Sequence, residues 1–168
     1  LKSLTKNKQL DVKYAVDKDK NRFKIAKRIK NTLKTSTEIN DVFNDKDIDA
    51  VFICTPAATH FKIAEKSILF KKHTFVEKPL CTRLTEVKKL FSLAEKKKIT
   101  LMSGDQYIYH DGINKIKKIL SKGQLVNILF INSERLNLGR VRNDVDVKLN
   151  FSTHDLSIIL NILNYRKV

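Results

Sequence analysis

Short polar turns that directly follow apolar runs carry the residues of this sequence that could do chemistry. The most specific of them is Glu77-Lys78-Pro79, which follows the apolar run 73–76. A lysine between a strand and a proline is held on a short turn, where its ammonium group could bind and polarise a substrate hydroxyl or carbonyl oxygen. The alternative is a surface ion pair between Glu77 and Lys78.

His154 could supply a base beside such an oxygen. It begins the segment 154–163, whose apolar residues recur at helical spacing. The positive end of a helix dipole lowers the pKa of an imidazole and favours its neutral form, which can accept a proton. A histidine at this position can instead cap the helix or pack against it.

Two more strand ends carry groups suited to binding a ligand. Asp17 closes an apolar run, and its carboxylate could accept hydrogen bonds from a ribose diol, although an aspartate is equally apt there as a helix N-cap. Thr55-Pro56 precedes a helix expected at 58–70, where free backbone N–H groups could face a phosphate or a ribose. Ordinary capping by a threonine is the alternative there.

The elements that position these residues alternate between strands and helices, which is typical of a parallel sheet with crossover helices. The run 50–54 is continuously apolar, as in strands that are buried on both faces, and Pro56 ends it because proline cannot continue a ladder. Ligands bind at the carboxyl ends of strands in such sheets, which is where the polar turns lie. We predict an α/β fold, a Rossmann-type doubly wound parallel sheet, with strands at 12–16, 50–54, 73–76 and 99–102 and helices at 22–29, 37–43, 58–70 and 85–97.

The pattern changes near Gly104, where we place a domain boundary. Residues 1–104 are expected to form the partial doubly wound domain, and residues 105–168 the start of an α+β domain. In the second part we expect a helix at 111–120, a strand at 125–132 and the helix at 154–163. A single strand cannot form a stable sheet, so a partner chain or further sequence is expected to cover these elements.

Composition and charge exclude several other classes of protein. The 168 residues are 42% hydrophobic and contain no apolar run of about 18 residues and no signal-like segment, so we expect a cytoplasmic protein that does not enter a membrane. Cys54 and Cys81 stand apart with no clustered histidines, which argues against a metal site and against a disulfide framework. The net charge of +16 would suit nucleic acid, but the lysines are spread over every expected helix. We therefore regard a nucleic-acid-binding module as the least favoured alternative.

The order and spacing of these blocks resemble the central part of the Gfo/Idh/MocA oxidoreductases, the family of glucose–fructose oxidoreductase and inositol dehydrogenase. The resemblance rests on Thr-Pro-Ala-Ala-Thr-His at 55–60, Glu-Lys-Pro at 77–79 and Leu-Met-Ser-Gly at 101–104. The segment 135–146, followed by His154-Asp155, resembles members of sugar or nucleotide-sugar metabolism. The resemblance implies an enzyme that uses NAD or NADP to move a hydride between the nicotinamide and a hydroxyl of a sugar, polyol or nucleotide sugar. It also implies a homo-oligomer at full length, since the C-terminal sheet of the family often mediates assembly.

Residue by residue, the resemblance implies a role for each candidate side chain. Asp17 would bind the adenosine ribose and favour NAD, because a carboxylate repels the 2′-phosphate of NADP. Lys78 would anchor the reacting hydroxyl, and His154 would remove its proton as the hydride leaves for the nicotinamide. The other implied contacts are Thr55, Pro56 and His60 along the dinucleotide, Glu77 near the nicotinamide ribose, and Arg142 and Asp144 with the substrate.

Three features depart from the family pattern. The first strand and the Gly-rich turn that binds the pyrophosphate have no counterpart here, and the C-terminal domain stops after one strand and a helix, so we expect a segment of a longer chain. The family usually has an aspartate four residues before the histidine, where this sequence has Asn150. An amide can orient an imidazole ring but cannot stabilise the imidazolium by charge. A non-catalytic nucleotide or nucleotide-sugar binder therefore stays open as the alternative to an enzyme.

Overall fold

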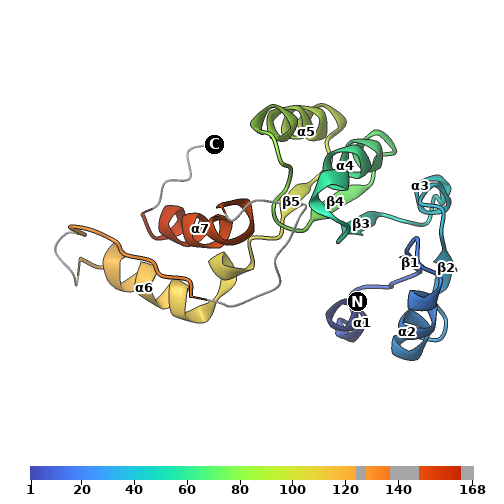
Figure 1. Ribbon diagram of the computed structural model, residues 1–168, viewed down its shortest axis with the longest axis horizontal. Helices are drawn as coiled ribbons and strands as arrows, with labels where there is room; N and C mark the ends of the chain where they lie inside the picture. Colours follow the sequence, from blue (N-terminus) through green and yellow to red (C-terminus); the bar gives the residue numbers. More distant parts are fainter. Residues whose placement is uncertain (124–127, 137–147, 164–168) are drawn as a thin grey trace.

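The computed structural model describes residues 1–123, 128–136 and 148–163. Strands and helices alternate along the chain (Figure 1), and the parallel sheets confirm the predicted Rossmann-type α/β fold. The strands are β1 Tyr14–Val16, β2 Lys34–Ser36, β3 Ala50–Ile53, β4 His73–Val76 and β5 Leu101–Ser103. The helices are α1 Lys2–Lys6, α2 Asn21–Ile29, α3 Asn40–Asn44, α4 His60–Leu69, α5 Leu84–Lys97, α6 Asp111–Ser121 and α7 Thr153–Ile162. Shorter helical turns are η1 Ala57–Thr59, η2 Gln106–Tyr109 and η3 Lys148–Ser152.

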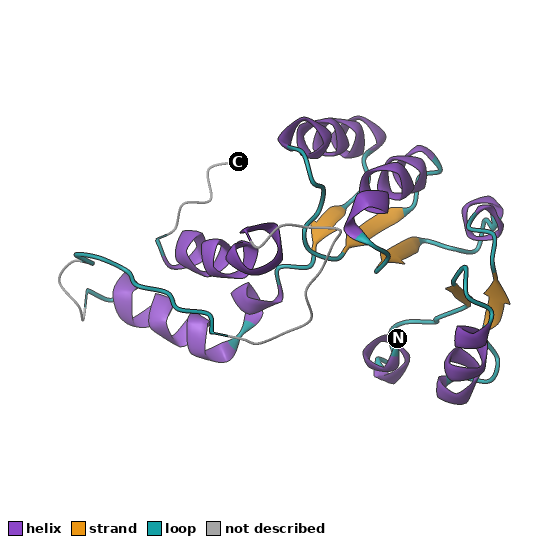
Figure 2. Cartoon of the chain, in the orientation of Figure 1, coloured by secondary structure: helices purple, strands orange, loops and turns teal. Residues whose placement is uncertain are grey.

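The described strands form two parallel sheets. One pairs β1 with β2, and the other has the order β3-β4-β5. In the second sheet α4 joins β3 to β4 and α5 joins β4 to β5, and the two helices lie side by side on one face (Figures 1 and 2). Ile53, Val76 and Ser103 are neighbours across this sheet, so the carboxyl ends of its three strands lie at one edge.

The main core lies between the second sheet and its two helices. Leu90 and Ala94 are four residues apart on α5 and therefore share the helix face that points at the sheet. The other face of the sheet is more open, because Phe52 is 44% exposed and packs on Phe75 with ring centroids 5.2 Å apart. The expected burial of 50–54 on both faces is thus wrong within the described residues. The buried side chains of this core are Ile53, Ala64, Ile68, Val76, Leu80, Cys81, Leu90 and Ala94.

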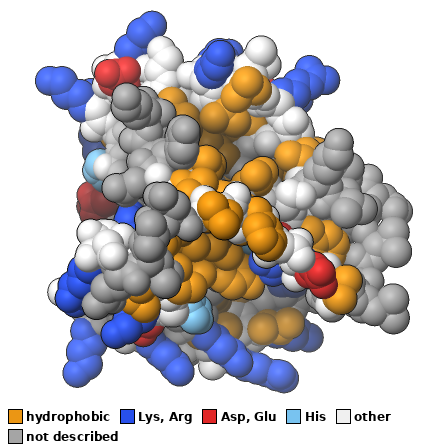
Figure 3. All heavy atoms as spheres, turned by 90° about the vertical axis from the view of Figure 1, so that its left-hand side faces the viewer, with side chains coloured by type: hydrophobic (Ala, Val, Ile, Leu, Met, Phe, Trp, Pro, Cys, Tyr) orange, Lys and Arg blue, Asp and Glu red, His pale blue; other side chains and the backbone are white. Residues whose placement is uncertain are grey.

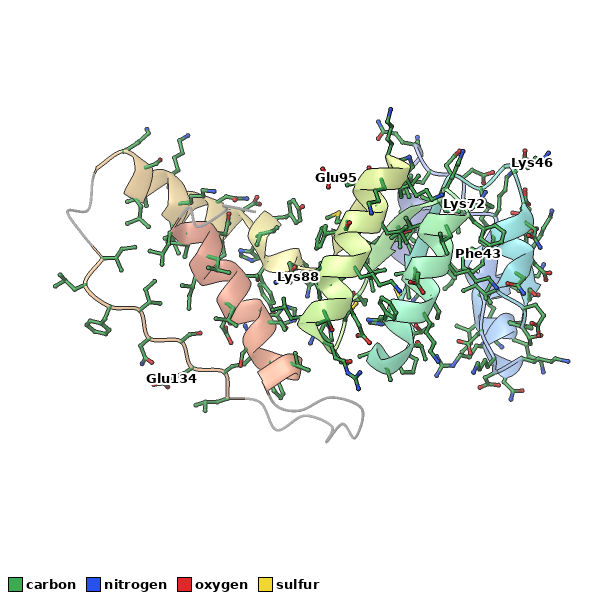
Figure 4. All side chains as sticks on the ribbon, turned by 90° about the horizontal axis from the view of Figure 1, so that it is seen from above. Phe43, Lys46, Lys72, Lys88, Glu95 and Glu134 are labelled. Carbon is green, nitrogen blue, oxygen red and sulfur yellow. The ribbon has the colours of Figure 1, made fainter. Side chains whose placement is uncertain are left out.

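Helix α3 joins the two sheets. Phe43 of α3 stacks on Phe70, just after α4, with ring centroids 5.5 Å apart. Lys72 is buried, and its ammonium group donates to the carbonyl oxygens of Asp45 and Ile48 at 2.7 and 2.8 Å. Figure 4 shows Phe43 and Lys72 between α3 and α4. These contacts fix the entry of β3, the strand whose far end carries the Thr55-Pro56 turn.

Most expected elements lie within a few residues of their expected positions, and the differences include β2 and the start of α3. Strand β2 is an addition, since its sequence Lys-Thr-Ser has no apolar pattern and its order comes from pairing with β1. Helix α3 begins at Asn40 rather than near 37, because Ser36 Oγ accepts the backbone N–H of Glu38 at 2.9 Å and holds a turn there.

The described helices of the C-terminal part are η2, α6, η3 and α7, and the described residues 128–136 form no helix or strand. Helix α7 packs against η2, α6 and η3. The strand expected at 125–132 is absent from its described portion, 128–132, where Leu129 and Phe130 are 91% and 83% exposed (Figure 2); residues 124–127 lie outside the described chain. A strand needs a pairing partner, and the described residues offer this segment none. Figure 3 shows hydrophobic side chains gathered on this end of the molecule.

Within the described ranges, no helix combines the length and the apolar character that crossing a membrane would require. The boundary near Gly104 coincides with the end of the last described strand, and it stays a prediction.

Candidate active site

The candidate site is built from the turns that follow β3, β4 and β5. The Glu77 N–H donates to the Ile53 carbonyl at 2.9 Å, and the Gly104 N–H donates to the Val76 carbonyl at 2.8 Å. These bonds continue the ladder one residue beyond the strands. They therefore set the polar turns Cys54-Thr55-Pro56, Glu77-Lys78-Pro79 and Gly104-Asp105 side by side at one edge, as the sequence predicted.

The turn that carries Lys78 is tightly held. The Lys78 backbone N–H donates to Glu77 Oε2 at 3.0 Å, and the Lys78–Pro79 peptide is cis. Gly104 lies against this turn so closely that an added Cβ would stand 3.2 Å from the Phe75 ring and 3.3 Å from Glu77 Cα. Lys78 is partly buried, so its side chain extends from a tightly held turn and not from an exposed helix.

His60 links the Thr55-Pro56 turn to the Lys78-Pro79 turn. Its ring is 1% exposed, with Nδ1 2.8 Å from the Pro79 carbonyl and Nε2 2.8 Å from the Thr55 carbonyl. Both ring nitrogens are thus engaged by the backbone. His60 therefore links the turns that follow β3 and β4. The expectation that it lines the dinucleotide stays a prediction.

Thr55 and Pro56 are exposed at the end of β3, where a ligand could reach them. The Thr59 hydroxyl lies 2.7 Å from both Thr55 Oγ1 and the Pro56 carbonyl and so holds the turn. Neither η1 nor α4 has a side-chain cap hydrogen bond, so the alternative of ordinary capping by a threonine is wrong. The contact of Thr55 and Pro56 with a dinucleotide stays a prediction.

Asp17 lies on the other sheet, at the end of β1. Its Oδ1 accepts the Asp19 N–H at 3.0 Å and its Oδ2 is 3.4 Å from the Arg22 guanidinium. With Val16 and Phe23 it lines an open hollow of about 510 Å³. The carboxylate therefore shapes the turn that precedes α2, but the N-cap residue of this helix is Lys20 and no side chain caps it, so the N-cap alternative for Asp17 is wrong. Asp17 also borders a space that could hold a ligand.

His154 lies in the first turn of α7 and is 8% exposed. Its ring meets the Tyr107 ring edge to face, with centroids 4.8 Å apart and planes at 75°. Burial lowers the pKa of the imidazole, the positive charges of Lys78 and Arg135 lower it further, and Asp105 and Asp155 oppose them. The neutral form, the one that can accept a proton, is therefore favoured.

The positive charge of Lys78 is among the causes that lower the pKa of His154, and η2, which follows β5, packs against α7. That the two residues act in one site stays a prediction. Sequence reasoning did not single out Tyr107 and Asp105, which follow β5, or Arg135 as an individual residue. Arg135 pairs with Asp155, whose position next to His154 in the sequence was the available clue. Three predicted residues have no described side chain: Arg142 and Asp144 lie outside the described residues, and Asn150 falls in η3 with its side chain outside them.

Comparison with known proteins adds family relationships to this geometry. The family model for the oxidoreductase family with an NAD-binding Rossmann fold (GFO_IDH_MocA) matches residues 1–105. The chain is 30% identical to the uncharacterized oxidoreductase YrbE of Bacillus subtilis over 133 residues, 76% of this chain and 39% of that protein. It is 30% identical to UDP-N-acetylglucosamine 3-dehydrogenase of Acidithiobacillus ferrooxidans over 115 residues, 68% of this chain and 36% of that enzyme.

Solved structures agree in fold. GenD2 from gentamicin A biosynthesis, crystallised with NAD, superposes with a TM-score of 0.83 at 19% identity over 95% of this chain and 48% of that one. This chain thus spans less than half the length of the relatives it matches. The strand-end motifs and the parallel sheets agree with the family-model match over residues 1–105. The chain therefore belongs to the Gfo/Idh/MocA oxidoreductase family, whose NAD-binding Rossmann fold it carries.

Proposed function

We propose that this chain is the part of an oxidoreductase that moves a hydride between a nicotinamide cofactor and a hydroxyl of a sugar, polyol or nucleotide sugar. The observation that carries the proposal is the arrangement of the polar turns at one edge of the β3-β4-β5 sheet, with the Lys78 turn in the middle and with α7, which carries His154, packed against η2 just after β5. The lowering of the His154 pKa by the charge of Lys78 supports it. Relatives such as UDP-N-acetylglucosamine 3-dehydrogenase support this class of substrate.

The chemistry assigns one task to each residue. Oxidation of an alcohol takes a proton from its oxygen and a hydride, with two electrons, from its carbon, and leaves a carbonyl group. Lys78 would hold the oxygen and stabilise the negative charge that develops on it. His154 would accept the proton, which its neutral form allows. In the reverse direction the imidazolium would return the proton to the oxygen.

The residues at the strand ends fit the cofactor of the family. Thr55 and Pro56 are exposed beside the end of β4, where Glu77 lies, and Asp17 borders the hollow next to α2. We assign these residues to holding the dinucleotide, with NAD favoured over NADP because of the Asp17 carboxylate. The bound nicotinamide supplies the group that accepts or donates the hydride.

Two measurements on the natural polypeptide that carries this sequence test the proposal. Fluorescence titration with NADH and NADPH should show binding, tighter for NADH. A panel of sugars, polyols and nucleotide sugars, each supplied with NAD, should yield NADH with at least one class. Failure to bind either dinucleotide would contradict the cofactor assignment.

The second candidate function is binding of a nucleotide or nucleotide sugar without turnover. Asn150 favours it, since an amide four residues before His154 cannot stabilise the imidazolium by charge. The substitution Asn150→Asp separates the two. Hydride transfer by the natural protein with Asn150 would exclude the non-catalytic function, whereas turnover that appears only in the variant would support it.

A further inference from the structure

Three side chains that have no direct task in the proposed reaction pack around His154. Tyr107 of η2 presents its ring edge to face with the imidazole at 4.8 Å. The Arg135 guanidinium lies 5.3 Å from the centroid of the same Tyr107 ring. Asp155 follows His154 in α7 and binds Arg135. The imidazole, the phenol and the guanidinium thus form one contiguous chain of contacts, which ends on Asp155, the residue next to His154.

The Arg135–Asp155 pair is built differently from an ordinary surface ion pair. Arg135 Nε donates to Oδ2 at 3.1 Å and its terminal nitrogen donates to Oδ1 at 2.9 Å, which is the forked geometry that only arginine offers. The two side chains are 28% and 19% exposed. Hydrogen bonding to Asp155 first, and to Tyr107 second, raises the pKa of Arg135, so the guanidinium is a permanent charge.

This chain of contacts matters because one nitrogen of the His154 ring lacks a hydrogen-bond partner among the described residues. Its Nδ1 is buried and has no hydrogen-bond partner in the described part of the chain. Among the described side chains, Tyr107 is the aromatic one that packs on the imidazole and so bears on the plane of the ring. Arg135 in turn holds Tyr107 and α7 together, since it contacts the Tyr107 ring on one side and Asp155 on the other.

We propose that Arg135 is a positioning residue for His154: through Tyr107 and Asp155 it fixes the imidazole and places a permanent cation beside it. The inference rests on the proposed function in taking His154 as the base. The charged groups that act on this imidazole are Lys78 and Arg135, which favour its neutral form, and Asp105 and Asp155, which oppose it. Loss of Arg135 removes one cation and leaves Asp155 unpaired, and both changes favour the imidazolium.

The test follows the imidazole C–H resonances by NMR, with the signal of His154 assigned through His154→Gln. In Arg135→Gln the titration midpoint of His154 should move to higher pH than in the natural protein. Arg28→Gln, an exposed arginine on α2, is the matched control and should leave the midpoint in place. An unchanged midpoint in a folded Arg135→Gln variant would overturn the inference.

The ring contact has a test of its own. Tyr107→Leu should displace the His154 resonances, because the aromatic ring current is lost, whereas Tyr107→Phe should largely preserve them. Tyr109→Leu, which removes a 61% exposed ring from the same turn, should have no effect. Equal displacement by the Tyr107 and Tyr109 variants would show that Tyr107 does not position the imidazole.

A kinetic comparison completes the experiment and covers the case in which Arg135→Gln does not fold. Arg135→Lys keeps the charge but loses the forked pairing, so kcat should fall roughly tenfold or more with KM for the dinucleotide nearly unchanged. Native kcat in Arg135→Lys would contradict a positioning role. The NMR results do not depend on turnover, so a natural protein that transfers no hydride would end the proposed function while leaving this inference to be decided by the titration.

Discussion

Among single residues, Lys78 is the one whose charge the proposed reaction needs most. Replacement by methionine keeps the apolar stem but removes the ammonium group, so the substrate oxygen loses its anchor. We expect kcat/KM of Lys78→Met to fall by roughly 10²–10³-fold while the dissociation constant for NADH changes little. Lys88→Met, at an exposed position of α5 (Figure 4), is the control and should keep its activity. Native kcat/KM in Lys78→Met would remove this lysine from the mechanism.

The buried imidazole of His154 should also make stability depend on pH. Its pKa is lowered in the folded protein, mainly by burial, so the unfolded chain takes up the proton first as the pH falls. This contribution to the free energy of unfolding is fully present above the pKa of an unfolded histidine and is lost as the pH falls from there toward the lower folded value. Urea unfolding at a series of pH values should show a shallower decline for His154→Gln than for the natural protein. Parallel curves would mean that the histidine titrates alike in both states.

The sequence was informative about which residues carry chemistry and much less so about what holds them. Lys78 and His154 could be singled out because a strand end and a helix start restrict a side chain locally. The role of His60 could not be predicted, because its two partners are main-chain carbonyls of Thr55 and Pro79, which only the packed sheet brings within 2.8 Å of one ring. The same holds for Arg135, whose partners lie on two other segments.

Among the elements, the junction of β4 and β5 depends on Gly104. A Cβ at this position would stand 3.3 Å from the backbone atom Glu77 Cα, which cannot move without shifting the Lys78 turn. We expect Gly104→Ala to lower the free energy of unfolding by about 1–3 kcal/mol, the usual cost of overpacking, as measured by chemical denaturation. Gly112→Ala is the matched comparison: it lies in the first turn of α6 and meets only the exposed His110 ring, so it should be tolerated. Equal effects of the two substitutions would contradict the close approach.

Strands were predicted correctly where apolar residues are dense in the sequence, and incorrectly where pairing with another strand determines whether a segment becomes a strand. Strand β4 matches its expected range, and β3 ends one residue earlier, because each is a compact apolar run closed by a polar turn. Strand β2 has only polar residues and exists because β1 pairs with it. The apolar run at 128–132 is the opposite of β2. Its residues are hydrophobic, but no described strand lies beside them to pair with, and they form no strand.

In the whole molecule, the site depends on how two parts of the chain meet. Lys78 belongs to the sheet and His154 to α7, and the link between them is η2, which directly follows β5 and packs against α7. The sequence predicted both parts and placed the boundary between them near Gly104. It gave no means of predicting their relative orientation, because that depends on contacts such as the one between Tyr107 and His154, which join residues far apart in the sequence.

The charge of the whole molecule leads to a prediction that separates the oxidoreductase from a nucleic-acid-binding module. The 34 lysines and arginines exceed the 18 acidic residues by 16, but a nucleic-acid surface needs its cations gathered on one face. On the face that Figure 3 presents, the cations lie around the rim of a hydrophobic patch. We expect duplex DNA to bind only in the non-specific range of about 10⁻⁴–10⁻⁶ M, to weaken steeply with salt, and to leave NADH bound. Fluorescence anisotropy of labelled DNA, with and without NADH over a series of salt concentrations, measures all three. Sequence-selective binding that survives physiological salt, or displacement of NADH by DNA, would require the basic surface to be a functional one.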